Sequence, residues 1–527
     1  MRREPENVCE TTALARRGAL MAIRTFAAID VGSYELGMKI FEVSRTRGIR
    51  EIDHVVRKID LGSETYATGK LSLHRIQEVR DILKEYRKIM DTYRVEEYQA
   101  YGTSAIREMT NASIILSQWE EETGIRIDVL TNSEQRFLDV KSVAYRSKNF
   151  ERIVSEGCAI VDIGGSSIQI SLFENGVLQS TQNLKLGVLR IREQLRHIDA
   201  RRSQLEKLIG EIVNSQMQVF TDLYLGERSF PNIIIIDDYL SSFLESQGRD
   251  LIDVGQFHSL AEYFSENSSS ELAREFRMSE DGIFLLHISG AMMRCIINAL
   301  GAVRVYAPGV TLADGIVYEY AENKKILPPS HDFEEDILAC ARNISGRYRG
   351  NAERGQSLDL ISMKIFDATK KIHGLGKRER FLLRLACILH DCGKYVSIAN
   401  VSECSYNIIM RTEIIGISHI EREIVAKVVL YNHSDFVYYE QQNTASDLDR
   451  DAYLTITKLT AILRLANGLD RTHKKKLDDM RVSVREDQLI ISARSGVDLT
   501  LEKALFQARA GFFTEIFGIV PVIRQRR

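Results

Sequence analysis

The spacing of apolar residues predicts alternating helices and strands in the first part of the chain. Apolar side chains recur every three or four residues between Ile76 and Tyr93, which is the period of an amphipathic helix. Residues 125–130 alternate apolar and polar side chains, as a half-buried strand does. Residues 131–133 are typical helix-capping residues and predict a helix that starts near Glu134. Strands that alternate with helices are typical of an α/β fold.

The same local pattern occurs twice in this region. In each copy an apolar strand ends in an aspartate, and a turn of glycine and serine leads into a second apolar strand. The two aspartates, Asp30 and Asp162, lie 132 residues apart. In the second copy Asn175 and Gly176 predict a tight hairpin to a third strand. The duplication predicts two lobes of related structure.

A helical pattern dominates after Pro328 and Pro329, which mark the best candidate for a domain boundary. The apolar period of helices is present in four later segments, 358–372, 378–389, 420–431 and 453–469. Residues 480–492 return to strand-like alternation. We therefore expect four parts, which are a leader (1–20), a first lobe (21–145), a second lobe (146–328) and a helical domain (329–527).

Composition and charge narrow the class of protein. The 527 residues are 44% hydrophobic and 27% charged, which is ordinary for a soluble globular chain. The net charge of −3 argues against a nucleic-acid-binding protein that relies on its overall charge. No unbroken apolar run approaches the ~20 residues that a membrane-spanning helix needs, so we expect no membrane association.

The seven cysteines are scattered and odd in number, so they do not suggest a disulfide framework. A reducing cytoplasm is therefore the expected location. Among the first 20 residues, Arg16 and Arg17 interrupt the only apolar stretch, which argues against a secretory signal. We interpret residues 1–20 as a disordered leader ahead of a fold that begins at Met21.

The two turns have the chemistry of a phosphate site that also holds a metal ion. Glycine lets the backbone approach a ligand closely, and successive N–H groups in such turns form a concavity that binds anions. The carboxylates of Asp30 and Asp162 are suitable ligands for Mg²⁺ or Mn²⁺. The candidate phosphate-binding residues of the turns are Gly32, Ser33, Gly164, Gly165, Ser166 and Ser167. One such turn is more often a plain strand end, but the duplicated pair favours a binding site.

Two further residues are candidates for catalysis. Glu134 follows the expected helix cap, where it is either a general base or a first-turn carboxylate favoured by the helix dipole. Arg107 either clamps a phosphate oxygen or is a solvated surface arginine. The residue pattern leaves both pairs of alternatives open.

Four ordered motifs together resemble the exopolyphosphatase/guanosine pentaphosphate phosphohydrolase (Ppx/GppA) family. They are the two turns at 30–33 and 162–167 and the segments 102–107 and 131–135. That family is similar in fold to the sugar-kinase/Hsp70/actin superfamily. The resemblance therefore implies an α/β protein with two actin-like, ribonuclease H-like lobes.

The resemblance also implies an activity, the hydrolysis of the terminal phosphoanhydride bond of inorganic polyphosphate or guanosine pentaphosphate. On this interpretation Mg²⁺ (or Mn²⁺) bridges Asp30, Asp162 and the substrate phosphate. Glu134 deprotonates the attacking water, and Arg107 and both turns bind phosphate oxygens. Positioning and charge neutralisation do most of the work in such transfers.

The chain departs from the family pattern at three places. Gln169 stands where the family has a carboxylate, and it cannot act as a base. The first turn continues as Tyr34 and Glu35, and residues 237–242 replace a glycine-rich turn that lines the family's phosphate crevice. These differences favour an alternative, a catalytically weakened regulatory protein that binds polyphosphate or an alarmone. An ATPase or kinase is a weaker third alternative, because no glycine pair is present that would seat an adenosine.

In the helical domain, His390, Asp391 and Asp470 resemble the core motif of an HD domain, in which adjacent His and Asp side chains share a divalent metal. The upstream histidine of that motif is missing, since residues 354–357 contain none. We therefore expect an all-α, HD-like scaffold without a working metal. The resemblance also suggests a homodimer formed through this region.

Two groups of basic residues lie in the same domain. They are the cluster Arg342, Arg347, Arg349 and Arg354 and the run 471–476. Such groups are usually solvated faces, and the alternative is a groove that holds a long polyanion.

Overall fold

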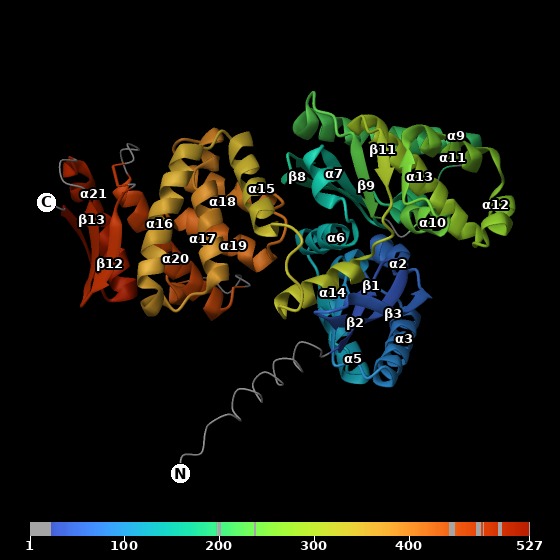
Figure 1. The fold of residues 1–527 in the computed structure, drawn as a ribbon, viewed down its shortest axis with the longest axis horizontal. Coiled ribbons are helices and arrows are strands. Elements are labelled where there is room, and N and C mark those ends of the chain that lie inside the picture. Colours follow the sequence, from blue (N-terminus) through green and yellow to red (C-terminus); the bar gives the residue numbers. More distant parts are fainter. Residues whose placement is uncertain are drawn as a thin grey trace, which may run out of the picture. The chain divides into compact units, whose positions relative to one another are not determined.

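The computed structural model describes residues 23–196, 198, 202–236, 239–441, 448–470, 476–477, 479–493 and 498–525. The leader expected at 1–20 lies outside the described residues, as does most of the basic run at 471–476. The chain divides into two compact units, residues 1–333 and 334–527, each of which is described by itself (Figure 1).

The first lobe of unit 1 is built on a five-stranded mixed sheet. The strand order is β3-β2-β1-β4-β5, in which β1, β2 and β3 are antiparallel while β4 and β5 run parallel to β1. The strands are β1 (Arg24–Val31), β2 (Glu35–Ser44), β3 (Gly48–Lys58), β4 (Glu97–Gly102) and β5 (Asp128–Val129). The last strand is shorter than the one expected at 125–130, because only residues 128 and 129 pair with β4.

Helices accompany this sheet, and two of them confirm expectations from the sequence. The helix predicted between residues 76 and 93 is α3, which buries Val79, Leu83, Tyr86 and Met90. The helix predicted near Glu134 is α6, whose N-cap is Thr131. The helices of the lobe are α2 (Leu61–Thr68), α3 (Leu73–Thr92), α4 (Ser104–Arg107), α5 (Ala112–Thr123) and α6 (Asn132–Arg146).

The second lobe repeats this plan on a six-stranded sheet. Strands β6, β7 and β8 form an antiparallel meander like β1–β3, and β9 runs parallel to β6 as β4 does to β1. The predicted hairpin is confirmed, since Asn175 and Gly176 both adopt positive φ between β7 and β8. The strands are β6 (Cys158–Ile163), β7 (Ile168–Glu174), β8 (Val177–Leu184), β9 (Asn232–Ile236), β10 (Leu251–Asp253) and β11 (Arg304–Tyr306).

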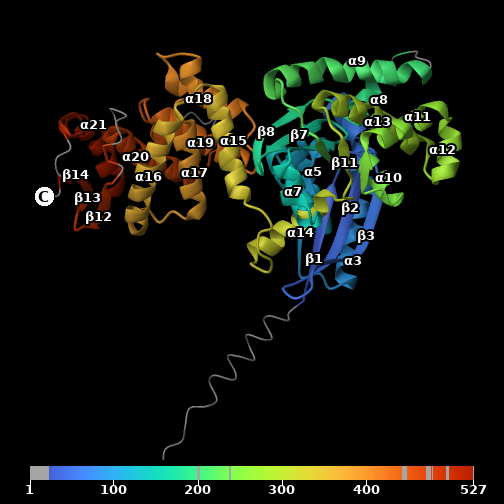
Figure 2. The ribbon, with the colours of Figure 1, turned by 45° about the horizontal axis from the view of Figure 1, so that its top comes forward.

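Helices α8 to α12 of the second lobe pack against α13, which is largely buried, whereas α7 packs on β6 and β7. Among the described helices, α13 is long and apolar enough to cross a membrane, yet 72% of that stretch is buried inside the lobe, as in a core helix. Figure 2 shows α9 running along the outer side of this lobe, where it packs on α13. The helices are α7 (Phe150–Ser155), α8 (Val188–Arg196), α9 (Arg202–Phe220), α10 (Leu240–Ser246), α11 (Val254–Glu266), α12 (Ser269–Phe276) and α13 (Glu280–Leu300).

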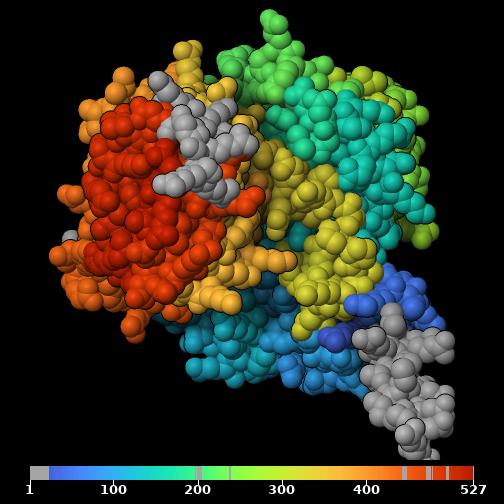
Figure 3. All heavy atoms as spheres, turned by 60° about the vertical axis from the view of Figure 1, so that its left-hand side comes forward, coloured from blue at the N-terminus to red at the C-terminus, as the bar shows by residue number. Residues whose placement is uncertain are grey.

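Helix α14 (Leu312–Asn323) connects the two lobes. It packs against α6 and β1, and the rings of Phe26 and Tyr320 stack with centroids 4.1 Å apart. Gly315 permits the close approach to α6, because a Cβ there would overlap the Leu138 carbonyl. In Figure 3 the yellow atoms of this segment lie between the blue atoms of the first lobe and the teal and green atoms of the second.

Unit 2 is mainly helical, and the four helices expected there are confirmed as α16, α17, α19 and α20. Its α-helices are α15 (Phe333–Arg347), α16 (Ala352–His373), α17 (Lys377–Leu389), α18 (Val401–Arg411), α19 (His419–Tyr431), α20 (Arg450–Leu469) and α21 (Thr500–Phe517). The expectation of an all-α domain is wrong, because the last part of the chain forms a three-stranded sheet. The strands are β12 (Arg481–Arg485), β13 (Gln488–Ala493) and β14 (Val520–Gln525).

Candidate active site

The two glycine–serine turns have the same backbone geometry. In the first, the Gly32 N–H donates to the Glu35 carbonyl at 3.0 Å, and in the second the Gly164 N–H donates to the Ser167 carbonyl at 2.9 Å. A Cβ on Gly32 would lie 2.8 Å from the Glu35 oxygen, so the first turn requires glycine there. The internal repeat therefore extends to the hydrogen bonds of the turns.

The turns also meet, one from each lobe. A Cβ on Gly165 would lie 3.2 Å from the Ser33 Cβ and 2.9 Å from the Leu189 Cδ1. Gly187 is so close to the second turn that a Cβ there would overlap the Gly165 carbonyl. The structure thus brings both predicted phosphate-binding turns to a single place at the junction of the lobes.

Four hydroxyl groups gather where the turns meet. The Ser33 Oγ lies 2.6 Å from the Tyr66 Oη and 2.8 Å from the Ser104 Oγ, and the two latter oxygens are 2.9 Å apart. The Ser166 hydroxyl is near enough to Tyr66 to lower the pKa of its phenol. Burial raises the pKa of the Tyr66 phenol, and the three serine hydroxyls only partly oppose this, so the phenol is neutral at neutral pH. We call Ser33, Tyr66, Ser104 and Ser166 the hydroxyl cluster.

Helix α8 of the second lobe reaches over the hydroxyl cluster with Arg190. Its guanidinium carbon lies 4.6 Å from the centre of the Tyr66 ring, its Nε donates to the Ser166 carbonyl at 2.9 Å, and its Nη2 donates to the Glu108 carboxylate at 2.7 Å. Arg190 thereby connects both lobes at the cluster. Neither Tyr66 nor Arg190 was predicted from the sequence, because no spacing or motif marks them.

A second arginine of α8 also joins the lobes. The side chain of Arg192 is only 4% exposed and forms ion pairs with Asp60 of the first lobe and Asp281 of the second. It also donates to the Ser63 hydroxyl at 2.7 Å. Tyr34, which departs from the family pattern, donates to Asp281 at 2.7 Å. Asp281 of the second lobe therefore connects Tyr34, which follows the first turn, to Arg192 of α8.

Glu134 and Arg107 lie on either side of one turn at the start of α6. The Glu134 Oε2 accepts hydrogen bonds from the Thr131 N–H at 2.9 Å and the Thr131 hydroxyl at 2.7 Å, and Thr131 in turn caps the helix. Arg107 donates to the Leu130 carbonyl at 2.6 Å. Glu134 therefore lies in the first turn of α6 and completes its capping box, and the Arg107 side chain is half-buried.

Asp30 and Asp162 are half-buried at the carboxyl ends of the first strands of the two repeats. Asp30 lies in register with Tyr101 of β4. Burial, and then neighbouring carboxylates that include Glu134, raise the pKa of Tyr101 to about 12. Glu134 is therefore within electrostatic reach of the strand beside Asp30. Within the described residues, no three His, Cys, Asp or Glu side chains gather closely enough to hold a metal ion by themselves.

Gln169, the other departure from the family pattern, lies opposite Asp162 in the register of β6 and β7. It is 3% exposed, and its Oε1 accepts a hydrogen bond from the Nε of Arg136 at 2.9 Å. Arg136 comes from α6, is itself buried, and also donates to the Thr181 hydroxyl. The position that the family gives to a carboxylate is thus a neutral acceptor for a buried guanidinium.

In unit 2, His390, Asp391 and Asp470 are all buried. The His390 Nδ1 donates to the Cys387 carbonyl at 2.8 Å, and burial lowers the pKa of His390 to about 4. The imidazole is therefore neutral at neutral pH. Asp391 accepts a hydrogen bond from the Lys394 Nζ at 3.0 Å. These three residues form no metal centre in the part of the chain that the structure describes.

Arg354 occupies the segment where the upstream histidine of an HD motif is expected. It is buried and donates to the Asn467 Oδ1 at 2.6 Å, and its charge contributes to the lowered pKa of His390. Arg342, from the same basic group, is exposed and ion-paired with Glu335. The predicted group therefore does not form one solvent-facing basic surface.

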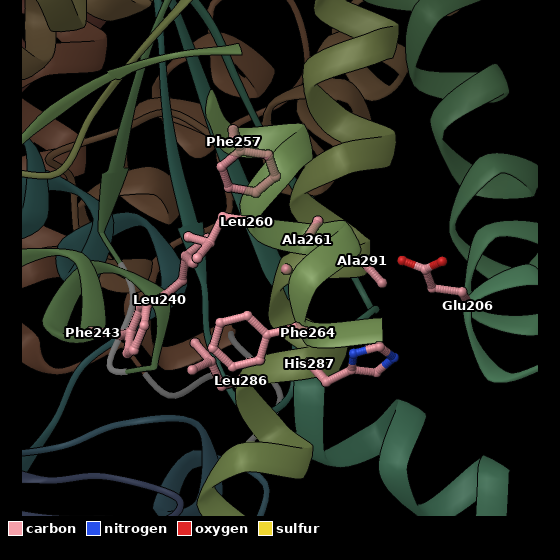
Figure 4. A pocket seen from close by; sticks show the side chains of 11 residues that line it. Glu206, Leu240, Phe243, Phe257, Leu260, Ala261, Phe264, Leu286, His287 and Ala291 are labelled. Carbon is pink, nitrogen blue, oxygen red and sulfur yellow. The ribbon is translucent and has the colours of Figure 1, made fainter. Parts of the chain in front are cut away.

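The second lobe also contains a small cavity that involves neither turn. Apolar side chains of α10, α11 and α13 line most of it, and its polar members are Glu206 and His287 (Figure 4). Glu206 is ion-paired with Arg294 at 2.8 Å. The cavity volume of about 20 Å³ leaves room for about one water molecule. It is too small to hold a phosphorylated substrate.

In comparisons with known proteins, both units match sequence models of one protein family. The sequence model of the Ppx/GppA phosphatase family matches residues 40–323, and that of Ppx/GppA phosphatase domain III matches residues 338–509. The chain is 20% identical to the guanosine-5'-triphosphate,3'-diphosphate pyrophosphatase of Photobacterium profundum and 22% identical to that of Vibrio cholerae. Each alignment covers 89% of this chain and 91% of the relative.

A solved structure shows the same fold. The crystal structure of an exopolyphosphatase from Cytophaga hutchinsonii superimposes with a TM-score of 0.50 and 16% identity, and the match covers 57% of this chain and 98% of that one. The duplicated turns, the two related sheets and the family matches agree with one another. The chain therefore belongs to the Ppx/GppA phosphatase family.

Proposed function

We propose that the protein hydrolyses the terminal phosphoanhydride bond of inorganic polyphosphate or of guanosine pentaphosphate. The observation that carries this proposal is the meeting of the two glycine–serine turns at Ser33 and Gly165. Two anion-binding turns that face a common point suit a substrate with adjacent phosphates. The names of the relatives from P. profundum and V. cholerae support a guanosine nucleotide with several phosphates as one candidate substrate.

In the proposed reaction Glu134 accepts a proton from the attacking water. Its Oε2 is held by Thr131, whereas its Oε1 accepts no hydrogen bond from any described residue. The cap therefore orients the carboxylate and leaves one oxygen for the proton. The water oxygen bonds to the terminal phosphorus as the bond to the bridging oxygen breaks, so orthophosphate and the shortened chain are the products. Arg107, beside the same turn, offsets the charge of the phosphate oxygens.

Asp30 and Asp162 suit a magnesium ion that binds together with the substrate. Mg²⁺ usually keeps several waters and takes one or two carboxylates plus substrate phosphates. Two half-buried carboxylates at strand ends offer that donor set, and they do not require a third protein ligand. When bound, the ion would offset the charge of the phosphoryl oxygens.

Glu134→Gln tests the catalytic assignment. A glutamine in this position still completes the capping box, so the thermal stability should change little while the base is lost. We expect phosphate release from polyphosphate and from guanosine pentaphosphate, assayed side by side with Mg²⁺, to fall about 10²- to 10⁴-fold. Thr131→Ser, which keeps the cap and the base, is the matched control. Equal rates for the wild type and Glu134→Gln would contradict the role of Glu134.

A second candidate function is a regulatory protein that binds the same anions with little hydrolysis. It is favoured by Gln169, whose amide oxygen is bonded to buried Arg136 where the family carries a carboxylate. Saturable binding of polyphosphate without phosphate release would support this candidate over the hydrolase.

For unit 2 we propose an HD-like scaffold that works without a metal ion, since Arg354 and Lys394 supply positive charge beside His390 and Asp391. We also propose a cytoplasmic location. The cysteines of the described chain are free, as is usual in a reducing compartment.

A further inference from the structure

Tyr66 contacts the groups that the proposed function assigns to a substrate phosphate. Its hydroxyl lies 2.6 Å from the Ser33 Oγ of the first turn and 2.9 Å from the Ser104 Oγ, and Ser166 of the second turn is near enough to lower the pKa of the phenol. The phenol oxygen thus hydrogen-bonds with serines from two of the predicted motifs and lies near a serine of a third. A phosphoryl oxygen in the same place would accept hydrogen bonds from these serine hydroxyls.

Tyr66 is more exposed than the serines that it contacts. Ser33, Ser104 and Ser166 are 8%, 9% and 4% exposed, whereas Tyr66 is half-buried. Over the Tyr66 ring lies Arg190, whose side chain is 27% exposed. A phosphate oxygen that binds the Ser33 and Ser104 hydroxyls needs the place that the phenol oxygen now occupies.

The chemistry of the two occupants makes them competitors. A phosphate dianion only accepts hydrogen bonds, and each serine hydroxyl has one proton to donate. A serine that donates to Tyr66, or to another serine of the cluster, cannot at the same time donate to a phosphate oxygen. The phenol is uncharged and holds its place through hydroxyl contacts and the Arg190 stack, so no buried charge is uncovered when it leaves.

We propose that Tyr66 occupies the terminal-phosphate position and must be displaced when the substrate binds. This inference rests on the proposed function, because the turns are taken as the phosphate site. Only the fraction of molecules with the phenol displaced can bind, so the apparent affinity is lowered by that fraction. Arg190, which stacks on the ring and touches the second turn, is released from the ring by the same movement and becomes available to the incoming anion.

Isothermal titration with sodium tripolyphosphate and Mg²⁺ tests the inference on the full chain. Tyr66→Phe removes the competing hydroxyl and keeps the ring, and we expect it to bind about 5- to 10-fold more tightly than the wild type. Tyr66→Ala, which also removes the ring, should bind at least as tightly. The matched control is Tyr98→Phe, since the Tyr98 hydroxyl donates to the Gly124 carbonyl at 3.1 Å, outside the hydroxyl cluster.

Unchanged or weaker binding by both Tyr66 variants, with unfolding temperatures close to that of the wild type, would overturn the inference. So would the absence of binding in every variant. Phosphate release is measured in parallel to separate this inference from the proposed function. Tighter binding without hydrolysis in any variant would leave the role of Tyr66 intact and refute the hydrolase. Hydrolysis by the wild type, together with a dissociation constant and a KM that the Tyr66 substitutions leave unchanged, would support the hydrolase and refute the role of Tyr66.

Discussion

At the junction of the lobes and in the core of unit 2, a side chain of the protein lies where the motifs suggest a small charged ligand. Tyr66 is neutral and half-buried among serines, whereas Arg354 is charged and buried beside His390 and Asn467. A neutral hydrogen bond contributes only about 0.5–1.5 kcal/mol net, but a hydrogen bond from a charged group contributes about 1.5–3 kcal/mol. The phenol is therefore displaceable, while the guanidinium is a permanent part of its unit.

The largest expected effect concerns the pH dependence of unit 2. Burial lowers the pKa of His390 to about 4, with Arg354 reinforcing and Asp391 opposing the shift, while a histidine in the unfolded chain has a pKa of about 6.5. Between these values only the unfolded chain binds the proton, so stability rises with pH in this window. We expect the contribution of His390 to the free energy of unfolding to be at its maximum above pH ~6.5. It should fall by about 3 kcal/mol as the pH decreases toward 4.

Urea unfolding followed by hydrogen-exchange mass spectrometry of α16 and α17 peptides measures this dependence. His390→Asn removes the titrating group and should flatten the pH profile in that window, whatever its effect on stability at pH 7. An equal slope in both proteins would mean that the core of unit 2 holds its histidine no differently from a surface histidine.

Arg354→Met tests whether the guanidinium is permanent. The variant leaves the buried Asn467 Oδ1 without its charged donor, and we expect unit 2 to lose about 2–3 kcal/mol of unfolding free energy. Because the charge of Arg354 lowers the pKa of His390, the lower edge of the acid-sensitive window should rise toward pH ~6.5, so that the window narrows and less free energy is lost within it. Arg349→Met, at an exposed position of the same basic group, should change stability by less than about 0.5 kcal/mol. If Arg354→Met changes neither the stability nor its pH dependence, the guanidinium is not a permanent part of unit 2, and it does not differ from Tyr66 in this respect.

Gln169→Glu should have the smallest effect. It tests whether the missing carboxylate at the junction of the lobes limits phosphate release. The new carboxylate has the shape of the amide and faces the Arg136 Nε, which lies 2.9 Å from the present Oε1. We expect a change of less than about 1 kcal/mol in stability and less than about tenfold in phosphate release, because the guanidinium would neutralise the carboxylate. Gln182→Glu on β8 is the control. A hundredfold rise in phosphate release would show instead that Gln169 alone weakens catalysis.

The fold could be predicted where it depends on local pattern. The helical period of 76–93 and the repeated strand–turn–strand pattern around Asp30 and Asp162 are present in the built structure. The four motifs identified the Ppx/GppA family, which the comparisons confirm. In unit 2 the strand-like alternation of residues 480–492 is present as β12 and β13. Strand β14 was not predicted, since it joins β13 across helix α21 and no local signal records such a pairing.

Some features of the candidate site could also be predicted from local sequence, and others could not. The sequence predicts the features that depend on neighbours a few positions away. These are the glycines of the turns, the capping residue before Glu134 and the aspartate at the end of each strand. The contact of Ser33 with Tyr66, the stacking of Arg190 and the bond from Arg136 to Gln169 join residues 33, 124 and 33 positions apart. The first contact depends on how α2 packs on the first turn, and the other two depend on how the lobes close on each other. Only the tertiary structure therefore decided which side chain fills the phosphate position.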